Sequence, residues 1–353
     1  MHTQSNFRLL VVRLGSMGDI LHALPAVTAL RQAHPEWVID WVVEPRWRAL
    51  LAAEGSIGRS PAKPLVDHLH MAPTKEWKHA PLSLKTISEI KILRRTLRAG
   101  AYDAVLDLQG AIRSAVVGRM AGCRRLIGED EPRERAARWL FTERVTTRGA
   151  HVIEQDVELA SAVAGDDLKF TRPWLPEDPI AEAWADKIMQ TSGAQPAVLI
   201  NPGAGWGAKR WPIERYAAVA QALIDRGLRV MINAGPGEEP LAEAIVESAA
   251  AATVIACSLD QLIALTRRVA LVIAGDTGPL HLACALGRPV VGIYGPTDPS
   301  RNGPFGTKFK VLRSPSSRLD HKRNAAPEAG LLTIQPEEVL RAADELLAEE
   351  NAR

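Results

Sequence analysis

An acid follows a turn in the segment RLGSMGDILHALP, residues 13–25. Residues 9–12 before it are strand formers, so Asp19 is expected at the start of the helix that follows this strand. Ser16 and Asp19 have the spacing of a capping box, in which the serine caps the helix and the acid bonds back. A carboxylate at such a turn can also act as a base that takes a proton from a hydroxyl group. The pattern leaves both roles open.

Four glycine-rich turns follow predicted strands in the second half of the chain. They are NPGAGWGAKRWP (201–212), NAGPGEE (233–239), AGDTGPLH (274–281) and YGPTDP (294–299). Glycine lets backbone amides approach phosphate oxygens without an obstructing Cβ, so four such turns together indicate a phosphorylated ligand. The segment GAGWGA (203–208) is followed by Lys, Arg, Trp and Pro before its helix, so it does not fit the GxGxxG fingerprint of nicotinamide enzymes, and no GxxxxGK[ST] loop of P-loop proteins occurs. The pattern therefore argues against both of those classes.

The turns lie between alternating strand and helix patterns. Strands are predicted at residues 9–14, 38–44, 104–109, 197–201, 228–233, 253–256, 270–274 and 290–294, and helices at 20–33, 87–98, 213–226 and 336–350. This alternation predicts parallel β-α-β units. The proline-rich, acidic stretch GDDLKFTRPWLPEDP, residues 165–179, interrupts it and is typical of a linker.

The fold class is therefore predicted as α/β, with two doubly wound, Rossmann-like domains facing a central cleft. The expected domains are residues 1–170 and 171–335, followed by an amphipathic helix at 336–353 that is expected to pack on either domain, including back on the N-terminal one. A chain of 353 residues is long enough for two separate cores. Open α/β sheets bind ligands at the carboxyl ends of their strands, so the turns described above are expected to line the cleft.

Composition narrows the class of protein and its surroundings. Charged residues make up 24% of the chain and the net charge is +2, which favours neither a nucleic-acid partner nor disorder. Cys123, Cys257 and Cys284 form no CxxC pair, as expected of a reduced compartment without a structural zinc site. No signal-peptide pattern and no apolar run of roughly 20 residues is present, so we expect a cytoplasmic protein.

Several segments together resemble the lipopolysaccharide heptosyltransferases of glycosyltransferase family 9, and most closely the heptosyltransferase I group. They are SMGDILHALPAV, DWVVE (40–44), YDAVLDLQG (102–110), HVIEQ (151–155), NPGAGWGAKRWP and GDTGPLHLACALGRPVVGIYGPTDP, in the family's order. The resemblance implies a GT-B fold, ADP-L-glycero-D-manno-heptose as donor and a Kdo-bearing lipid A as acceptor. It further implies inversion at the anomeric carbon and no metal or other cofactor.

The resemblance also implies roles for residues of the second half. Lys209 matches the residue that offsets the diphosphate charge, and Glu238 matches the acid that holds the adenosine ribose. The implied donor site comprises Gly203, Ala204, Gly205, Lys209, Glu238, Asp276, Thr277, Gly278 and His281. Gly203, Ala204 and Gly205 stand where the family has threonines, so backbone amides would replace hydroxyl contacts to phosphate. Without the resemblance, Lys209 is an ordinary loop lysine, Glu238 a first-turn helix acid and His281 a packed histidine.

On the acceptor side the catalytic acid of the family falls on Asp19, a role compatible with helix capping. The implied acceptor contacts are Ser16, Gly18, Lys78, Gln109 and Arg133. Basic residues of the first half suit the Kdo carboxylate and the lipid phosphates; they are Lys75, Lys78, Lys85, Lys91, Arg94, Arg95, Arg98, Arg133, Arg135 and Arg138. With Trp77 and Trp139 they also suit an anionic membrane surface, which predicts peripheral contact with the cytoplasmic face of the inner membrane.

Three alternatives to this function remain at the level of sequence. Heptosyltransferase II or another family 9 transferase would differ in its acceptor. A nucleotide-sugar 2-epimerase uses the same type of fold for another reaction, and a sugar-nucleotide binder would carry out none. Release of ADP that requires an acceptor separates a transferase from the last two. The sequence predicts no oligomeric state.

Overall fold

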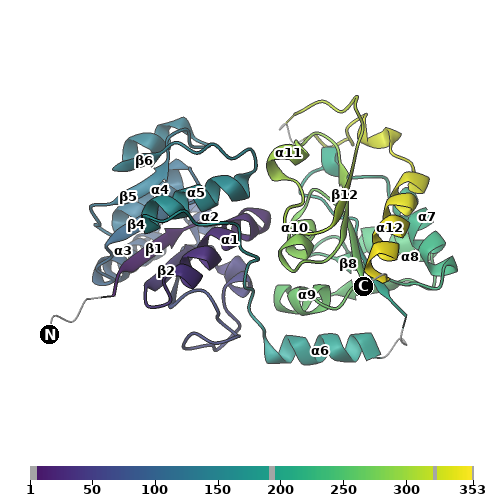
Figure 1. Cartoon of the computed structure of the whole chain (residues 1–353), viewed down its shortest axis with the longest axis horizontal. Coiled ribbons are helices and arrows are strands. Elements are labelled where there is room, and N and C mark those ends of the chain that lie inside the picture. The colour runs from purple at the N-terminus through teal and green to yellow at the C-terminus, as the bar shows by residue number, and fades with distance from the viewer. Residues whose placement is uncertain (1–5, 191–194, 321–323, 352–353) are drawn as a thin grey trace. The chain divides into compact units, whose positions relative to one another are not determined.

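The computed structural model of the chain describes residues 6–190, 195–320 and 324–351 (Figure 1). It contains two compact units, Met1–Glu177 and Asp178–Arg353. The division lies inside the linker that the sequence predicts at 165–179, a few residues beyond the expected boundary at 170. Each unit is a parallel sheet with flanking helices, so the predicted α/β class with two doubly wound domains is confirmed.

The sheet of the first domain has six parallel strands in the order β3-β2-β1-β4-β5-β6. The strands are β1 (Arg8–Val12), β2 (Val38–Val43), β3 (His68–Met71), β4 (Ala104–Asp107), β5 (Leu126–Glu129) and β6 (Glu143–Val145). The chain winds outward first on one side of β1 and then on the other. The reversal therefore lies between β1 and β4, which pair with Leu10 opposite Val105. Ligand sites of doubly wound sheets lie outside the carboxyl ends of the strands at this position.

Helices cover both faces of this sheet. They are α1 (Met17–Ala33), α2 (Thr74–His79), α3 (Leu84–Ala99), α4 (Ile112–Met120) and α5 (Val152–Ala164), with short 3-10 turns η1 (Pro45–Leu50) and η2 (Arg135–Leu140). Leu10 and Val12 share one core cluster with Leu93 and Leu97 of α3. Neighbouring strand residues point to the opposite face, where α5 packs on β4 and against α1.

The second domain repeats this winding in the order β12-β11-β10-β7-β8-β9, again with parallel strands. The strands are β7 (Ala197–Asn201), β8 (Arg229–Ala234), β9 (Thr253–Ala256), β10 (Leu271–Gly275), β11 (Val290–Tyr294) and β12 (Phe309–Arg313). Its reversal lies between β10 and β7, which pair with Ala274 opposite Asn201. The two loops that leave these strands therefore start side by side.

The helices of the second domain include the C-terminal one. They are α6 (Pro179–Gln190), α7 (Ile213–Asp225), α8 (Glu239–Ser248), α9 (Leu259–Thr266), α10 (Gly278–Ala285), α11 (Pro299–Asn302) and α12 (Pro336–Asn351), with 3-10 turns η3 (Gly207–Lys209) and η4 (Leu331–Thr333). Val339, Ala343 and Leu346 of α12 are buried in the core of this domain, and α12 packs on α7, β11 and β12. The sequence left open which of the two domains this helix packs on, and the structure shows that it completes the core of the second.

The two longest helices of the first domain differ in how deeply they are buried. In α1 nearly every side chain is buried, and α5 packs along this helix. In α3 only Thr86, Leu93 and Leu97 are buried, and the rest of the helix is largely exposed. Within residues 6–190, 195–320 and 324–351, no helix is long and apolar enough to cross a membrane.

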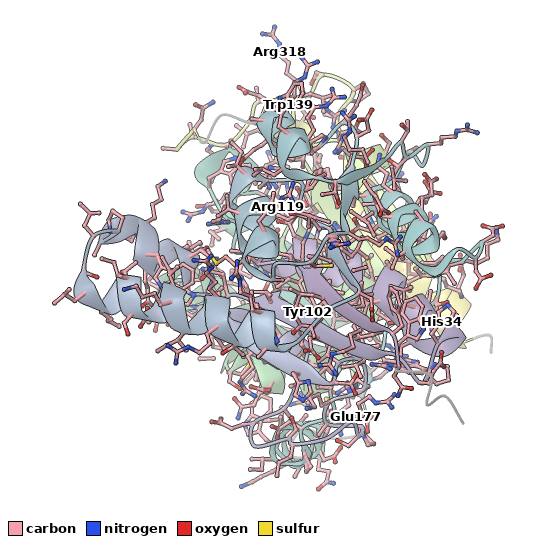
Figure 2. The ribbon with its side chains drawn as sticks, turned by 90° about the vertical axis from the view of Figure 1, so that its left-hand side faces the viewer. His34, Tyr102, Arg119, Trp139, Glu177 and Arg318 are labelled. Carbon is pink, nitrogen blue, oxygen red and sulfur yellow. The ribbon has the colours of Figure 1, made fainter. Side chains whose placement is uncertain are left out.

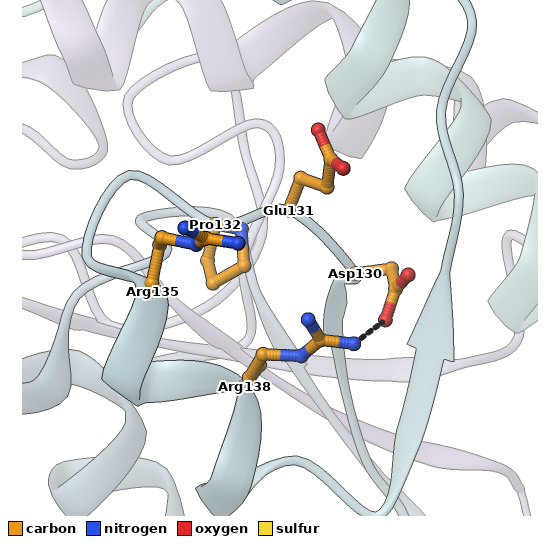
Figure 3. Close-up of a pocket in the computed structure, with 5 residues that line it drawn as sticks. All are labelled: Asp130, Glu131, Pro132, Arg135 and Arg138. Carbon is orange, nitrogen blue, oxygen red and sulfur yellow. Dashed lines mark hydrogen bonds and ion pairs between the residues drawn. The ribbon is translucent and has the colours of Figure 1, made fainter.

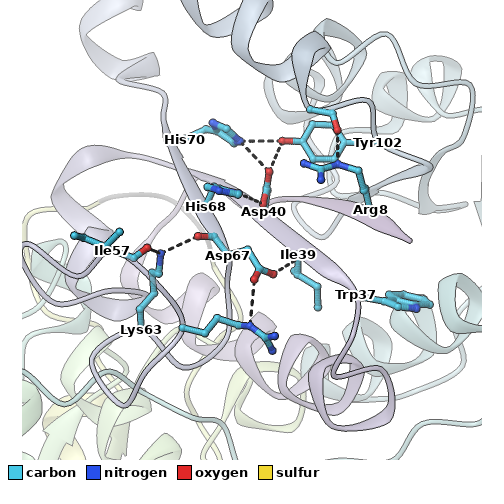
Figure 4. A network of polar contacts seen from close by, with 12 residues as sticks. Arg8, Trp37, Ile39, Asp40, Ile57, Lys63, Asp67, His68, His70 and Tyr102 are labelled. Carbon is cyan, nitrogen blue, oxygen red and sulfur yellow. Dashed lines mark hydrogen bonds and ion pairs between the residues drawn. The ribbon is translucent and has the colours of Figure 1, made fainter. Parts of the chain in front are cut away.

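A buried polar network secures the edge of the first sheet (Figure 4). Asp40 of β2 is 2% exposed and accepts a hydrogen bond of 2.6 Å from the hydroxyl of Tyr102. Its carboxylate lies 2.9 Å from Nδ1 of His68 and 3.5 Å from Nε2 of His70, both on β3. Burial alone would raise the pKa of Asp40, but the bonds from His70, Tyr102 and His68 lower it to about 2. An ionised carboxylate thus joins β2 to the short edge strand β3.

Candidate functional site

The predicted donor residues gather at the carboxyl edge of the second sheet. Lys209 lies in η3 after β7, Glu238 follows β8, and Asp276 directly follows β10. Since β10, β7 and β8 are neighbours in the sheet, their loops leave the same edge next to one another. The sequence prediction that these glycine-rich turns follow strands is therefore correct for all three.

Lys209 and Asp276 form a close ion pair between Nζ and Oδ2. The side chains are 11% and 9% exposed, and Nζ also lies 3.4 Å from the backbone oxygen of Asp276. The ammonium stands 4.3 Å from the ring centroid of Trp206, within the range of a cation–π interaction. On the other side of the carboxylate, Nε2 of buried His281 lies 3.2 Å from Oδ1. The side chain of Lys209 is thus fixed by Asp276 and Trp206, unlike that of an ordinary exposed lysine.

The charge balance of this cluster follows from its burial. Burial raises the pKa of Asp276, but the contacts with His281 and Lys209 outweigh it and hold the pKa well below its usual range. The carboxylate is therefore ionised and compensates the ammonium of Lys209. An anionic ligand at this edge would compete with Asp276 for the same cation. His281, which lies on α10, contacts the carboxylate oxygen of Asp276 that does not pair with Lys209.

Glu238 lies against the first glycine-rich turn. A Cβ on Gly203 would come within 2.1 Å of the Glu238 carboxylate, so glycine is needed there for this close approach. Oε2 of Glu238 accepts a 3.2 Å hydrogen bond from the amide of Gly235, and burial raises the pKa of this half-buried acid. Glu238 stands at the N-cap position of α8 but does not cap it with its side chain. Its carboxylate instead reaches toward the 203–205 loop.

The remaining donor residues line the same edge. Ala204 is buried and Gly205 is exposed in the loop after β7. Thr277 is the N-cap residue of α10, and its hydroxyl donates to the backbone oxygen of Gly275 at 3.2 Å. Gly278 begins the helix, so the amides at the start of α10 lie next to Asp276.

A distant segment holds the loop that carries Lys209, and sequence analysis did not single it out. The amide of Ala208 donates to the oxygen of Asn324 at 3.0 Å, and the amide of Glu328 donates to the oxygen of Ala208 at 3.2 Å. A Cβ on Gly207 would stand 1.6 Å from the oxygen of Ala325, so only glycine permits this contact. The third glycine of GAGWG therefore serves packing between two loops.

In the first domain Asp19 makes the contacts of a capping acid. It is the third residue of α1, and Oδ2 accepts hydrogen bonds from the amide of Ser16 at 2.8 Å and from its hydroxyl at 3.2 Å. The other oxygen lies 3.3 Å from Nη2 of buried Arg13, whose Nε donates to the backbone oxygen of Asp19 at 3.1 Å. The acid half of the predicted capping box is confirmed. The side chain still keeps 31% of its surface exposed.

These partners keep Asp19 ionised. Burial would raise its pKa, but Arg13, the Ser16 amide and Arg133 act against burial and lower it below the usual value. A carboxylate oxygen can accept more than one hydrogen bond, so the exposed side of Asp19 remains able to receive a proton. Capping and a role as base are geometrically compatible.

Two buried acids on which the charge of Arg13 acts were not predicted from the sequence. Asp107 ends β4, and its Oδ1 accepts from the amides of Gln109 and Gly110 at 2.8 and 2.9 Å. Asp156 lies on α5 and is 3% exposed. In both acids Oδ2 is buried without a hydrogen-bond partner among the residues that the structure describes. Burial raises the pKa of Asp107 to about 6 and that of Asp156 to about 7, even though the charge of Arg13 opposes both shifts.

Four of the five predicted acceptor residues lie near Asp19, three of them in loops and Gly18 in α1. Ser16 contacts it directly, and Gly18 precedes it in the first turn of α1. Gln109 is buried, and its Oε1 accepts from the amide of Leu14 at 2.8 Å. Arg133 is exposed and its charge helps to lower the pKa of Asp19. Lys78 is exposed on α2, a separate element.

The structure corrects the expected surface role of Trp77 and shows how its helix is fixed. Trp77 is buried, with 8% of its surface exposed, and its Nε1 donates to Glu89 at 2.8 Å. It therefore belongs to the core, whereas Trp139 is 79% exposed.

At the start of α2, buried Glu44 accepts hydrogen bonds from the hydroxyl of Thr74 and from the amide of Lys75. An acid at the end of β2 thus anchors the helix that carries Lys78.

A small pocket lies at the segment that follows β5 (Figure 3). It is lined by Asp130, Glu131, Pro132, Arg135 and Arg138. Arg135 and Arg138 bring positive charge to the pocket. Nη2 of Arg138 lies 3.1 Å from Oδ1 of Asp130, so the charge of Arg138 is partly compensated. In the described parts of the chain, no three His, Cys, Asp or Glu side chains are grouped so as to hold a metal ion.

Known proteins are similar to this chain along most of its length. The family model described as glycosyltransferase family 9 (heptosyltransferase) matches residues 90–330. Lipopolysaccharide heptosyltransferase 1 of Escherichia coli K12 is 31% identical, over 88% of this chain and 95% of the relative. The structure of E. coli heptosyltransferase WaaC with ADP has a TM-score of 0.78 at 27% identity, covering 96% of this chain and all of the other. E. coli heptosyltransferase II matches with a TM-score of 0.77 at 25% identity, covering 98% of this chain and all of the other.

Replacing Asp156 with asparagine tests the buried acids. The pKa of Asp156 is raised in the folded chain, so an unfolded aspartate loses its proton near pH 4 while the folded one keeps it to about pH 7. The wild type therefore loses stability as pH rises through this window. We expect the free energy of unfolding of Asp156→Asn, relative to wild type, to increase between pH 4.5 and 8 by up to roughly 4 kcal/mol. Denaturant unfolding across this range measures it.

Asp167→Asn serves as the matched control, because Asp167 is 81% exposed and pairs with the exposed Lys169. Its difference from wild type is expected to stay nearly constant with pH. Parallel stability profiles for wild type and Asp156→Asn would show that Asp156 is not held protonated in the fold.

Proposed function

The chain belongs to glycosyltransferase family 9, the heptosyltransferase family, and on that premise we propose its donor, acceptor and mechanism. The proposed reaction moves heptose from ADP-L-glycero-D-manno-heptose to Kdo of the lipopolysaccharide inner core, with inversion and without a metal. Relatives named lipopolysaccharide heptosyltransferase 1 support the acceptor class. WaaC structures with ADP and with ADP-2-deoxy-2-fluoro heptose support the donor class.

The observation that carries the proposal is the buried Lys209–Asp276 pair at the reversal of the second sheet. A diphosphate leaving group needs positive charge as its bond to the sugar breaks. Lys209 supplies that charge, and the amides of Thr277 and Gly278 at the start of α10 add oriented dipoles. When the diphosphate engages Lys209, Asp276 is left to accept hydrogen bonds from heptose hydroxyls.

Glu238 completes the donor side. Its carboxylate lies over Gly203 and is bonded to the amide of Gly235, next to the loop that we propose for the phosphates. A carboxylate accepts hydrogen bonds from two adjacent hydroxyl groups, which suits the ribose diol of ADP. With Gly203, Ala204 and Gly205 in place of hydroxyl side chains, backbone amides of this loop contact the phosphates.

On the acceptor side we propose Asp19 as the base. The acceptor hydroxyl oxygen attacks the anomeric carbon from the face opposite ADP, the bond from that carbon to the diphosphate oxygen breaks, and the hydroxyl proton passes to Asp19. A low pKa keeps Asp19 ionised but makes it a weak base. It suffices because the electron-poor anomeric centre acidifies the attacking hydroxyl, so that the proton moves late.

The acceptor's negative charge is matched by basic residues of the first domain. Arg133 and Lys78 are both exposed and are proposed to bind the Kdo carboxylate, with Ser16, Gly18 and Gln109 shaping the loop around the hydroxyl. A Kdo-bearing lipid A is a membrane lipid. We therefore place the reaction in peripheral contact with the cytoplasmic face of the inner membrane.

Acceptor-dependent release of ADP tests this function. Purified protein in EDTA is incubated with ADP-heptose alone, with Kdo-lipid A, or with an acceptor that already carries one heptose, and ADP and product mass are measured. We expect ADP release only with Kdo-lipid A, and a product heavier by one heptose.

The other outcomes separate the alternatives. Transfer only to the heptosylated acceptor would assign heptosyltransferase II activity, which the similarity to that enzyme also permits. Donor conversion without acceptor would indicate an epimerase, and binding without turnover would indicate a sugar-nucleotide binder. Activity that is lost in EDTA and restored by magnesium or manganese would contradict the metal-free mechanism.

Asp19→Asn separates the two roles of that acid. Asparagine can still accept a hydrogen bond from the Ser16 amide but cannot take up the acceptor proton. Because it also removes the charge opposite buried Arg13, stability is expected to fall by more than the about 0.5–2 kcal/mol of a lost cap, in a variant that still folds. Heptose transfer is expected to fall by roughly 10² to 10⁴-fold, the range for a lost general base, while ADP affinity stays near wild type.

A matched control is Asp178→Asn, because Asp178 also accepts amide hydrogen bonds at a helix start, from Ile180 and Ala181. This control should keep wild-type transfer. Near-wild-type transfer by Asp19→Asn would reduce Asp19 to a cap.

A further inference from the structure

The hairpin of α2 and α3, residues 74–99, carries an exposed positive surface, of which the catalytic proposal uses Lys78 alone (Figure 2). Its Lys and Arg residues are all exposed; they are Lys75, Lys78, Lys85, Lys91, Arg94, Arg95 and Arg98. They face only two acids within the hairpin, Glu76 and Glu89. Glu89 is engaged by the indole of Trp77, and Lys85 lies 3.9 and 3.8 Å from Glu76 and Glu89. The hairpin therefore presents excess positive charge.

Apolar side chains stand at the tip of this charged hairpin. Leu82 and Leu84, in the turn between the helices and at the start of α3, are each 87% exposed, and Ile92 on α3 is 58% exposed. The turn is ordered by Ser83, whose Oγ accepts from the amide of Thr86 at 3.1 Å. Below it, Trp77 and Leu93 anchor the hairpin in the core. The two leucines are thus held outward by a fixed turn.

We infer that the α2–α3 hairpin docks the protein on an anionic lipid bilayer, with Leu82 and Leu84 entering the interface and the basic side chains lying on the headgroups. Apolar tips beside Lys and Arg are what an interfacial membrane element requires, because burial of apolar area adds to attraction by anionic lipids. Two leucines are too small a patch for a stable protein dimer, which needs far more buried area. The choice of a membrane as partner rests on the proposed function; the binding test below does not.

The inference replaces the expected membrane contact through Trp77. That side chain is buried under the hairpin and stabilises it, while the leucines of the turn supply the exposed apolar surface. Lys78 lies on the same hairpin. Docking would therefore bring a proposed Kdo-binding residue to the membrane surface where a lipid-linked acceptor is held.

The test is vesicle co-sedimentation of the full chain, with vesicles that contain no lipid A. Phosphatidylglycerol mixed with phosphatidylethanolamine is compared with pure phosphatidylcholine, at about 0.1 M and at higher salt. Wild type is expected to bind the anionic vesicles and to lose this binding with salt or with neutral lipid. Leu82→Ser/Leu84→Ser is expected to lower the partition coefficient about tenfold or more, because two apolar side chains no longer enter the interface.

The matched control is Ile57→Ser/Ile180→Ser, since Ile57 and Ile180 are 93% and 82% exposed and lie outside the hairpin. It should bind like wild type, and both double variants should unfold at the wild-type temperature. Lys91→Glu/Arg95→Glu keeps the leucines and should remove most of the preference for anionic vesicles. Wild type that binds no vesicles, or leucine variants that bind like wild type, would overturn the inference.

A change in oligomeric state on removing the two leucines, with unchanged vesicle binding, would also overturn it and would assign the patch to a second copy of the chain. Transfer to a soluble, deacylated Kdo acceptor should be equal in wild type and Leu82→Ser/Leu84→Ser. Transfer to acceptor in vesicles should fall with vesicle binding. Vesicle binding as expected, together with no transfer to any acceptor, would refute the proposed function and leave the inference standing.

Discussion

The arrangement of the second domain depends on the ion pair between Lys209 and Asp276. Two charges that are each about nine-tenths buried are costly to remove from water, and their attraction offsets that cost only where the geometry is close and further hydrogen bonds exist. His281 provides such a contact on one side, and the ring of Trp206 faces the ammonium on the other. The segment around Asn324 fixes the backbone beside Lys209. In the proposed mechanism, these supports keep a compensated positive charge at the sheet edge until the diphosphate replaces the carboxylate as the partner of Lys209.

The first domain stabilises a negative charge, that of Asp19, where the second stabilises a positive one. Arg13 lies among three carboxyl groups, those of Asp19, Asp107 and Asp156. Burial raises the pKa of Asp107 and of Asp156 to about 6 and about 7, so these two acids hold their protons more firmly than Asp19 does. The guanidinium is therefore left to pair mainly with Asp19, which is ionised. In the proposed mechanism this places the negative group on the acceptor side and the positive group on the donor side.

Local patterns predicted much of this arrangement. Strands such as 197–201 and 290–294 are continuous apolar runs bounded by turns, and the structure places them at the same residues. The strands β3, β5, β6 and β12 were not predicted. The first three have only three or four residues, mixed with polar ones, and β12 has basic residues at two of its five positions. The capping geometry of Asp19 follows from its spacing to Ser16 and was also predictable.

Local sequence patterns could not predict contacts between residues that are far apart in the chain. Asp156 resembles any polar residue on a helix until α5 is packed against α1 and β4, which removes it from water. Trp77, among basic residues, looks like a surface tryptophan, yet its burial depends on α3 folding back over α2 and supplying Glu89. The ion pair of Lys209 with Asp276 depends on the pairing of β7 with β10, which lie far apart in sequence. Strand order in the sheet decides which loops meet, and strand order is not a local property.

The central claim, that Lys209 offsets the charge of the departing diphosphate, is tested most directly by the single-turnover rate of heptose transfer at saturating donor. Saturation removes differences in binding, so the rate reports the chemical step. Lys209→Ala is expected to lower this rate by roughly 10²-fold or more, as for loss of one preorganised charge, in a protein that remains folded. A folded Lys209→Ala variant that transfers heptose at the wild-type rate would contradict the claim.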